Sequence, residues 1–352
     1  MPTSPTLDQI KRQTRDLWER SFPDDTPAFL DVYFDEKYRA DVNLTHLEAG
    51  RVVAAMQLLP YRMTIGGEAL RVGYVSGLCV DEAHRGQGLA ANLLRQAHCR
   101  LRSEGGALAL LIPGTEDLRR FYETTVHGAY RTATFRHTVT VVDTGVAATD
   151  VSLVYYQSPI RSPLDELYAF YDSHRTADYA LRPSKTDFRA ALRSVCDEGG
   201  LVVEARRQDH LVGVCLAVKT AESRAFLPML TAPEEGVKNL MVRELKRRLS
   251  ADQVYMKLPC VATSAASRPY AMARVVDAGR FLTAMARLYP DLDLVIGIDA
   301  DHVVAEPERT FHIHHGCAAP TTASPTQVFT PGSLAAHFLA ARPVTMELML
   351  DE

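Results

Sequence analysis

The chain has 352 residues and a formal net charge of −4, with 47% apolar and 23% charged residues. This length is too great for one compact core and predicts two or three domains. The small net charge gives no reason to expect nucleic acid or an anionic membrane as partner, and no apolar run of about 18 residues predicts a transmembrane helix.

The N-terminus turns polar within its first residues and lacks the apolar run of a secretory signal. The six cysteines are scattered, and no two of them form a Cys-x-x-Cys pair. A disulfide scaffold or a zinc ribbon is therefore not expected. These features together predict a cytoplasmic protein.

The first part of the chain predicts a mixed α/β unit. Residues 6–40 have a helical pattern, residues 42–47 and 52–59 predict a hairpin, and residues 65–68 predict a second tight turn. A strand rich in Val, Tyr and Leu follows over residues 70–80. Residues 89–101 then predict a helix with its apolar residues four apart, and residues 107–112 a wholly apolar strand.

The pattern restarts near residue 150. A helix is expected at 167–174, a hairpin at 201–205 and 211–218, a strand at 225–231, a helix at 237–249 and a strand at 253–258. This order repeats that of the first part and indicates a weak internal duplication. After a linker at 264–269, a third unit is predicted, with a helix at 276–285, strands at 292–299, 302–306 and 310–315, and a helix at 332–340.

The connection between strand 70–80 and helix 89–101 has the composition of an anion site. Its six residues are Arg85, Gly86, Gln87, Gly88, Leu89 and Ala90. The two glycines let the backbone turn tightly and approach a ligand closely. The N–H groups at the start of the helix attract an anion, and an arginine side chain suits phosphate. A pyrophosphate ligand would use all of these groups.

Two common nucleotide motifs are missing here, because the segment contains neither Gly-Lys-Ser/Thr nor Gly-x-Gly-x-x-Gly. The Arg-x-x-Gly-x-Ala pattern resembles the coenzyme A loop of GNAT acetyltransferases. The strand before it, the amphipathic helix after it and the apolar strand 107–112 strengthen the match. The resemblance implies an acetyl-CoA co-substrate whose phosphates contact residues 85–90. It also implies that its pantetheine arm pairs with the backbone of three residues, Leu78, Cys79 and Val80.

The order of the three units resembles the enhanced intracellular survival acetyltransferases. This resemblance implies an α/β (α+β) fold with tandem GNAT folds, splayed mixed sheets and a small sterol carrier protein type 2-like domain. The expected boundaries are 1–150 for the catalytic domain, 151–268 for a GNAT-like domain without the loop, and 269–352 for the last domain. Residues 272–277 and 294–299 resemble the opening helix and the first strand of the sterol carrier domain.

Acetyl transfer needs a proton donor for the leaving thiolate, and Tyr122 is the first candidate. A phenol with a pKa of about 10 carries a transferable proton at neutral pH. In the GNAT family a tyrosine after the apolar strand has this role, which implies it for Tyr122, with Tyr130 as the alternative. The competing interpretation is that Tyr122 is a buried packing aromatic.

No carboxylate on strand 70–80 offers a general base. Similar enzymes place their own C-terminal carboxylate in the active site, which implies this role for Glu352. The ending, residues 346–352, is apolar enough to dock as a strand, although a solvated tail is the alternative. His84 and Glu82 flank the loop and are expected on its outer, solvated side.

No metal site is predicted. His312 and His314 share one face of a predicted strand, but no third ligand is close to them in sequence, which favours an ordinary strand face. In the middle unit, Pro233 removes an N–H group, and Glu234 and Glu235 would repel pyrophosphate where the first unit has its loop. The sequence therefore predicts one acetyl-CoA per chain.

These features predict an N-acetyltransferase that moves the acetyl group of acetyl-CoA directly to a primary amine of a small molecule or a protein lysine. An acceptor pocket is expected between the first domain and the others. Two other classes stay open. One is a non-catalytic protein that binds coenzyme A or a lipid through its last domain, and the other is a homo-oligomer that uses the middle domain as its interface.

Overall fold

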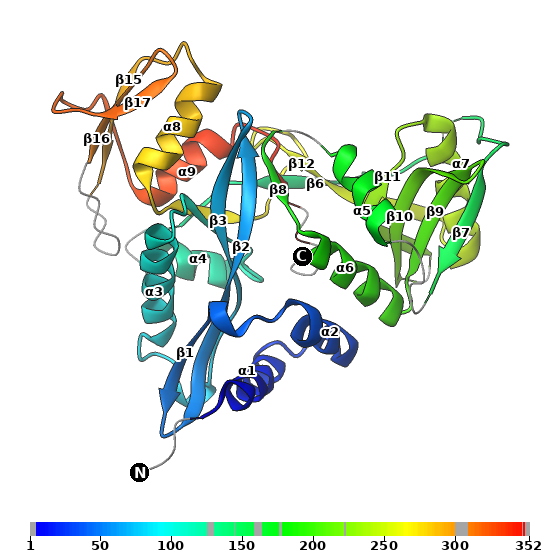
Figure 1. Ribbon diagram of the computed structural model, residues 1–352, viewed down its shortest axis with the longest axis horizontal. Coiled ribbons are helices and arrows are strands. Elements are labelled where there is room, and N and C mark those ends of the chain that lie inside the picture. Colours follow the sequence, from blue (N-terminus) through cyan, green and yellow to red (C-terminus); the bar gives the residue numbers. More distant parts are fainter. Residues whose placement is uncertain are drawn as a thin grey trace.

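The computed structural model describes residues 5–124, 130–143, 145–157, 164–175, 178–221, 223–299, 309–346 and 348. The described residues form three sheets, of eight, seven and four strands, with helices packed on their faces (Figure 1). The mixed α/β class expected from the sequence is therefore confirmed.

The first sheet is built around one long hairpin. Strands β2 (Arg51–Ile65) and β3 (Glu68–Val80) pair antiparallel through a turn in which Gly66 and Gly67 have φ angles of 56° and 77°. Strand β1 (Asn43–Glu48) pairs with one end of β2, and the short β4 (Leu108–Leu111) pairs parallel with the middle of β3. The strands predicted over residues 42–112 are all present.

Helices cover both faces of this sheet. Helix α3 (Leu89–Ser103) buries an apolar stripe that includes Leu93 and Leu101 against one face. Two N-terminal helices, α1 (Leu7–Ser21) and α2 (Pro27–Val32), lie on the opposite face with the π-helical turn η1 (Tyr33–Lys37). The N-terminal helices thus cover the face of β3 that α3 leaves open.

The second sheet repeats this plan. Its order is β9 (Leu201–Arg207), β10 (His210–Ala221), β11 (Arg224–Thr231) and β12 (Gln253–Cys260), and β11 and β12 pair parallel just as β3 and β4 do. Helix α7 (Glu235–Leu249) connects the two parallel strands and packs on one face. Helices α5 (Leu164–Ser173) and α6 (Lys185–Asp197) cover the other face, and β7 (Ser152–Tyr156) adds an edge strand.

Each sheet is completed by a strand that the other half of the chain supplies. After β5 (Arg131–Thr132), which stays in the first sheet, β6 (Phe135–Thr140) crosses to pair with β12. After β13 (Arg268–Pro269), which stays in the second sheet, β14 (Met272–Val275) crosses back to pair with β4. The two halves therefore exchange equivalent strands and cannot be separated by cutting the chain at one point.

This exchange corrects one expectation. The helix expected over residues 272–277 is wrong, because Met272–Val275 is strand β14, with all four residues buried between β4 and β5. A short apolar run flanked by turns gives no period from which a buried strand can be told from a helix. The helix of this region, α8, begins at Ala278 and ends at Leu288.

The last part of the chain forms the third sheet and then returns to the first. The third sheet has the order β17 (Cys317–Pro320), β16 (Thr310–His314), β15 (Leu294–Ile298) and β18 (Gln327–Phe329). Helix α9 (Pro331–Leu339) packs with α8 against β14 and the first sheet. Strand β19 (Thr345–Met346) then pairs with β8 (Ala180–Arg182), which itself pairs with β2. The strand expected at 302–306 lies outside the described residues.

Candidate active site

The segment between β3 and α3 is an open backbone turn. A single 3₁₀ turn (Glu82–His84) follows β3, and Gly86 and Gly88 then take φ angles of 78° and 77°. Apart from the adjacent residues in the chain, no heavy atom of the described residues lies within 4 Å of the position of a Cβ at either glycine. The backbone at Gly86 and Gly88 is therefore open to a ligand. We call residues 85–90 the anion loop.

The start of α3 lacks the side-chain cap that other helices of this chain have. Thr6, Ser184 and Thr330 each accept a hydrogen bond from the first turn of α1, α6 and α9, whereas Gly88 at the start of α3 has no side chain to do so. The first N–H groups of a helix need an acceptor from outside the helix. Because the helix dipole also favours negative charge there, an anion is the natural partner.

The charged side chains around the anion loop also favour the binding of an anion. Arg85 is exposed, its Nε donates at 3.4 Å to the carbonyl of Val80, and no carboxylate pairs with it among the described residues. His84, by contrast, lies 3.1 Å from both Asp81 and Glu48. The imidazole is thus held on the outer side by carboxylates, and the guanidinium stays available for a ligand.

Strands β3 and β4 part beside the loop. Their last paired residues are Tyr74 and Leu110, whereas β3 continues to Val80. Leu78, Cys79 and Val80 lie beyond a register shift at which Gly77 has a φ of 59°. Cys79 and Val80 pair with β2 on one side, and the three residues have no partner in β4 on the other. Burial raises the pKa of the Cys79 thiol to about 12, so Cys79 is not a nucleophile at neutral pH. The open edge offers backbone amides beside the loop.

An aromatic wall supports this part of β3 from the face opposite α3. The ring of Trp18 lies directly against Gly77, and the hydroxyl groups of Tyr33 and Ser76 lie 2.9 Å apart in a buried hydrogen bond. No sequence pattern indicated a role for these residues. The one available signal was a single tryptophan on an amphipathic helix, and nothing in the sequence links it to residue 77.

Tyr122 lies close to the point where the strands part. It belongs to helix α4 (Glu116–Thr124) and shares an apolar cluster with Val75 of β3 and Leu111 of β4. The side chain is 7% exposed, and burial raises its pKa to about 12. The phenol therefore keeps its proton through the neutral range.

Tyr130 occupies a different environment in the same cluster. It is fully buried, and its hydroxyl lies 2.8 Å from Nε2 of His98, whose Nδ1 accepts from Arg274 of β14 at 3.2 Å. Burial, together with the neighbouring guanidinium, holds the pKa of His98 well below its usual value. A neutral His98 that accepts at Nδ1 carries its proton on Nε2 and donates it to Tyr130. The Tyr130 hydroxyl is thus bound within the core.

The tail of the chain returns to the first sheet through a buried lysine. Leu348 is fully buried, and its carbonyl accepts a hydrogen bond of 3.2 Å from Nζ of Lys37. The same ammonium donates to the Tyr61 hydroxyl at 2.9 Å and lies 3.9 Å from a carboxylate oxygen of Asp187. Thr345, Met346 and Leu348 are therefore held against the first sheet, whereas Glu352 lies outside the described residues.

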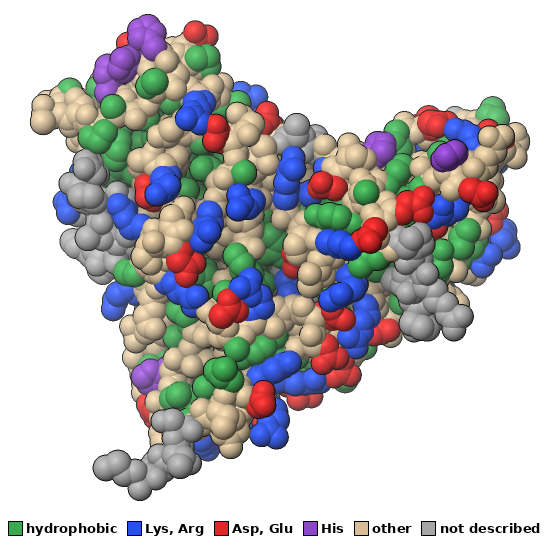
Figure 2. All heavy atoms as spheres, viewed as in Figure 1, with side chains coloured by type: hydrophobic (Ala, Val, Ile, Leu, Met, Phe, Trp, Pro, Cys, Tyr) green, Lys and Arg blue, Asp and Glu red, His purple; other side chains and the backbone are tan. Residues whose placement is uncertain are grey.

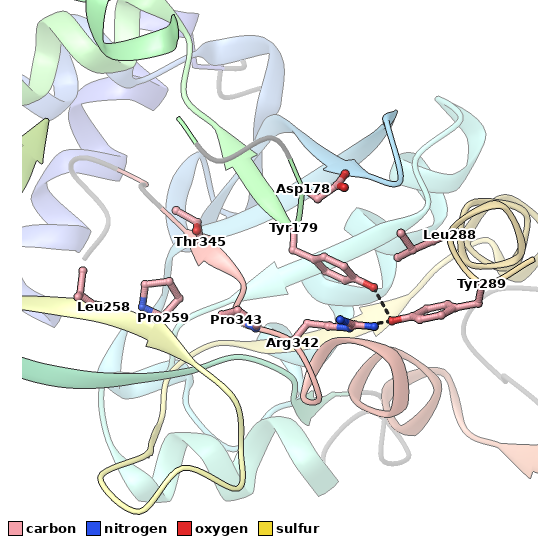
Figure 3. Close-up of a pocket in the computed structure, with 9 residues that line it drawn as sticks. All are labelled: Asp178, Tyr179, Leu258, Pro259, Leu288, Tyr289, Arg342, Pro343 and Thr345. Atoms are coloured by element: carbon pink, nitrogen blue, oxygen red, sulfur yellow. Dashed lines mark hydrogen bonds between the residues drawn. The ribbon is translucent and has the colours of Figure 1, made fainter. Parts of the chain in front are cut away.

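A cavity of about 630 Å³ lies away from the anion loop, where β8, β12, α8 and the tail meet (Figure 3). The Tyr179 and Tyr289 hydroxyls lie 2.9 Å apart, and Nε of Arg342 donates to Tyr289 at 3.1 Å. The three polar groups point toward one another across the cavity, as Figure 3 shows. Neither the open edge of β3 nor the anion loop contributes to the lining of this cavity, so it is separate from the candidate active site.

The counterpart of the anion loop in the second sheet is closed to an anion. Helix α7 begins after Glu234, which gives its first turn no side-chain hydrogen bond and pairs instead with both Nη atoms of Arg207 at 2.8 and 2.9 Å. A carboxylate therefore lies where a phosphate would have to approach.

The histidines on β16 form a surface cluster. The rings of His312 and His314 have centroids 4.4 Å apart, and Nε2 of His312 lies 2.8 Å from Asp293. In the described part of the chain, no three His, Cys, Asp or Glu side chains come close enough together to hold a metal ion. Within the same residues, no helix is long and apolar enough to span a membrane.

Comparison with known proteins matches the first part of the chain to one domain family. Residues 6–125 match the family model described as an acetyltransferase (GNAT) domain. No curated protein matches the chain.

Three solved structures share the fold over almost the whole length. A probable N-acyltransferase of unknown function from Enterococcus faecalis is 12% identical, with a TM-score of 0.73 over 97% of this chain and 89% of its own. Eis1 from Mycobacterium abscessus is 16% identical, with a TM-score of 0.71 over 94% and 87%. A GCN5-related N-acetyltransferase from Kribbella flavida is 16% identical, with a TM-score of 0.69 over 99% and 94%.

Proposed function

We propose that this chain, whose residues 6–125 are a GNAT acetyltransferase domain, moves the acetyl group of acetyl-CoA directly to a primary amine. The acceptor would be a small molecule or a protein lysine. The observation that carries the proposal is the anion loop, with its two glycines and uncapped helix, at the end of a strand whose edge is open.

The residues present fit the parts of acetyl-CoA. Arg85 and the first N–H groups of α3 would hold the pyrophosphate, with Gly86, Gln87, Gly88, Leu89 and Ala90 supplying backbone around it. The free backbone edge of Leu78, Cys79 and Val80 would pair with the amides of the pantetheine arm. The thioester carbonyl would then lie between β3 and β4, close to Tyr122.

Acetyl-CoA supplies an activated acyl group, and the chain supplies orientation and proton transfer. The acceptor nitrogen forms a bond to the carbonyl carbon as the carbon–sulfur bond breaks. A backbone N–H on the open edge of β3 stabilises the oxygen, and Tyr122 gives its proton to the sulfur. Because its pKa is raised by burial, Tyr122 is protonated at neutral pH and has a proton to give when the thiolate leaves.

The base in this proposal is the terminal carboxylate of Glu352, which would hold the amine and accept its proton through water. Lys37 supports this idea, because it binds the carbonyl of Leu348 and turns the tail toward the first sheet. Lys37 is a positioning residue in this scheme and touches no reacting atom.

The remaining parts of the proposal concern the whole chain. Units 1–150, 151–268 and 269–352 would serve as the catalytic, GNAT-like and sterol carrier-like domains, with β6 of the first unit lying in the second sheet and β14 of the last unit lying in the first sheet. The protein would act in the cytoplasm and without a metal.

A matched pair of glycine variants tests the binding step. Gly88 and Gly50 both have a φ of 77° and open space around a Cβ, but only Gly88 belongs to the anion loop. Gly88→Val should abolish acetyl-CoA binding measured by calorimetry, whereas Gly50→Val should bind as the parent protein does. Equal binding by the two variants would falsify the assignment. Release of free thiol from acetyl-CoA with a panel of amines then tests transfer itself.

A further inference from the structure

Three arginines lie side by side across three neighbouring strands. Arg62 of β2 is the direct cross-strand partner of Arg71 on β3 and also of Arg182 on β8. Directly opposed residues of antiparallel strands point to the same face of the sheet, and like charges in such positions destabilise the sheet. A row of three is therefore an arrangement that folding alone does not favour.

The row lines a cavity of about 540 Å³. The cavity occupies a break in the sheet edge: β1 pairs with β2 up to Gln57 and β8 pairs with β2 from Arg62, so residues 58–61 have no strand partner on that side. Leu58, Pro60 and Tyr61 from this break line the cavity together with residues of α3 and α6. Its volume is that of a pocket for a small molecule.

The carboxylates that line the cavity pair mainly with groups outside the arginine row. Asp41 pairs with Arg39, Glu104 pairs with Arg100 at 2.8 Å and lies 3.8 Å from Arg71, and Asp187 accepts from Ser184 in the cap of α6. Among the described residues, the side chains of Arg62 and Arg182 form no ion pair or hydrogen bond. In Figure 2, basic side chains gather over β2, β3 and β8 in the hollow between the first and second sheets.

We propose that this cavity is a second binding site, for a small molecule with two or three carboxylate or phosphate groups. Neighbouring strands are about 4.8 Å apart, so the three guanidinium groups cover a span of roughly 10 Å. Arginine binds both kinds of anion through two parallel hydrogen bonds. A polyanion here would supply the counter-charge that the row lacks.

The site is separate from the anion loop and does not depend on the proposed activity. Arg71 precedes Leu78 by seven residues on β3, which corresponds to roughly 20 Å along a strand. The cavity also borders the far end of α3, at Arg100 and Glu104, whereas the anion loop is at its start. A ligand bound here would contact both the first sheet and the second unit, through Arg182 and the start of α6.

Citrate is the probe for the test, with the full chain in dilute buffer. The variant is Arg62→Gln combined with Arg182→Gln. A charge-matched control combines Arg12→Gln with Arg51→Gln, two exposed arginines outside the cavity, of which Arg51 is on the same strand as Arg62. A third variant, Arg85→Gln, shows whether citrate binds at the anion loop instead. Citrate affinity is measured by calorimetry, and the unfolding midpoint by calorimetric scanning without citrate.

The proposal expects two opposite effects in the same variant. Without citrate, the Arg62/Arg182 variant should unfold about 1–3 °C higher than the parent chain, because the like-charge row is relieved. With citrate, its affinity should fall at least tenfold, while the control and the Arg85→Gln variant bind as the parent does. Sodium chloride at equal ionic strength should stabilise the parent chain less than citrate does.

Two results would overturn the proposal. One is citrate binding that is equal in the parent chain and the Arg62/Arg182 variant, and the other is a stabilisation of the parent chain by citrate no larger than that by sodium chloride. If the double variant unfolds, Arg182→Gln alone is used, since this exposed side chain forms no ion pair or hydrogen bond in the described part of the chain, and the same two comparisons apply.

Discussion

Trp18 and Gly77 are in direct contact in a way that leaves no room for any other residue at position 77. A Cβ at Gly77 would lie 1.9 Å from Cζ3 of the Trp18 ring, and the glycine has a φ of 59°. The contact fixes β3 where its register with β2 shifts and its edge opens. The shape of the proposed pantetheine edge thus depends on an N-terminal helix.

Replacing Gly77 with alanine should therefore damage both stability and acetyl-CoA binding. Overpacking typically costs about 1–3 kcal/mol, and the positive φ adds strain of about 1 kcal/mol. Thermal unfolding and calorimetric binding measure the two effects. The control is Gly50→Ala, which has the same sign of φ but open space, and should show the strain alone. In a Trp18→Ala background the cost of Gly77→Ala should shrink, and an unchanged cost would refute the coupling.

Tyr122 and Tyr130 should respond differently to the same substitution. Tyr122→Phe is expected to lower turnover by roughly a hundredfold with little change in acetyl-CoA affinity, because it removes a proton donor. Tyr130→Phe should leave turnover close to normal and lower the free energy of unfolding by about 1 kcal/mol, because His98 loses its acceptor. Steady-state kinetics measure the turnover of both variants, and denaturant unfolding measures their free energies of unfolding. The opposite pattern would move the donor role to Tyr130.

The tail should matter for turnover more than for cofactor affinity. Deleting Asp351 and Glu352 should lower kcat at least tenfold, and Lys37→Met should do the same by releasing the Leu348 carbonyl. Glu352→Gln keeps the terminal carboxylate and should be nearly silent. The kinetic constants for acetyl-CoA and for the amine separate these effects. Full activity with a C-terminal extension would exclude the tail from the mechanism.

His98 makes stability depend on pH in a predictable direction. Its folded-state pKa is depressed, whereas the unfolded chain binds a proton near pH 6.5, so protonation favours unfolding. The contribution of neutral His98 to the free energy of unfolding is fully present above pH 6.5. It is lost as the pH falls below that value, by up to about 1.4 kcal/mol per pH unit. Unfolding midpoints between pH 7.5 and 5.5 should fall less steeply for His98→Gln. Equal slopes would mean that other groups control this range.

One molecule of acetyl-CoA should bind to each chain. The second sheet has the strands and the helix of a GNAT fold, but Glu234 and Arg207 occupy the position of the anion loop. Isothermal titration gives the stoichiometry directly. A value of two, or binding that survives Gly88→Val, would place a site on the second sheet.

Short-range patterns in the sequence predicted much of the fold. The β2–β3 hairpin, the anion loop and α3 follow from turn glycines, from β-branched runs and from a four-residue apolar repeat, all of which act over short distances. The same patterns predicted β9 to β12 and α7. The loop that carries the proposed function was found because its backbone conformation needs glycine at particular positions.

Contacts between distant segments were beyond such reasoning. The helix expected over residues 272–277 came from a family resemblance, and it is a strand instead. Its partner β4 lies more than a hundred residues earlier, and nothing local indicates the pairing. Trp18 and Lys37 acquire their roles only when helices meet β3 and the tail. The arginine row exists only once β8 pairs with β2, since residues 62 and 182 have no relation in sequence.

The strand exchange also sets an order of events during synthesis. β4 is complete at Leu111, but its partner β14 is not made until Val275, a delay of roughly ten to thirty seconds on a ribosome. Through that interval the edge of β4 that β14 will cover has no strand from this chain to pair with, and such an edge attracts foreign strands. The first sheet can therefore be completed only after the C-terminal part of the chain has been made.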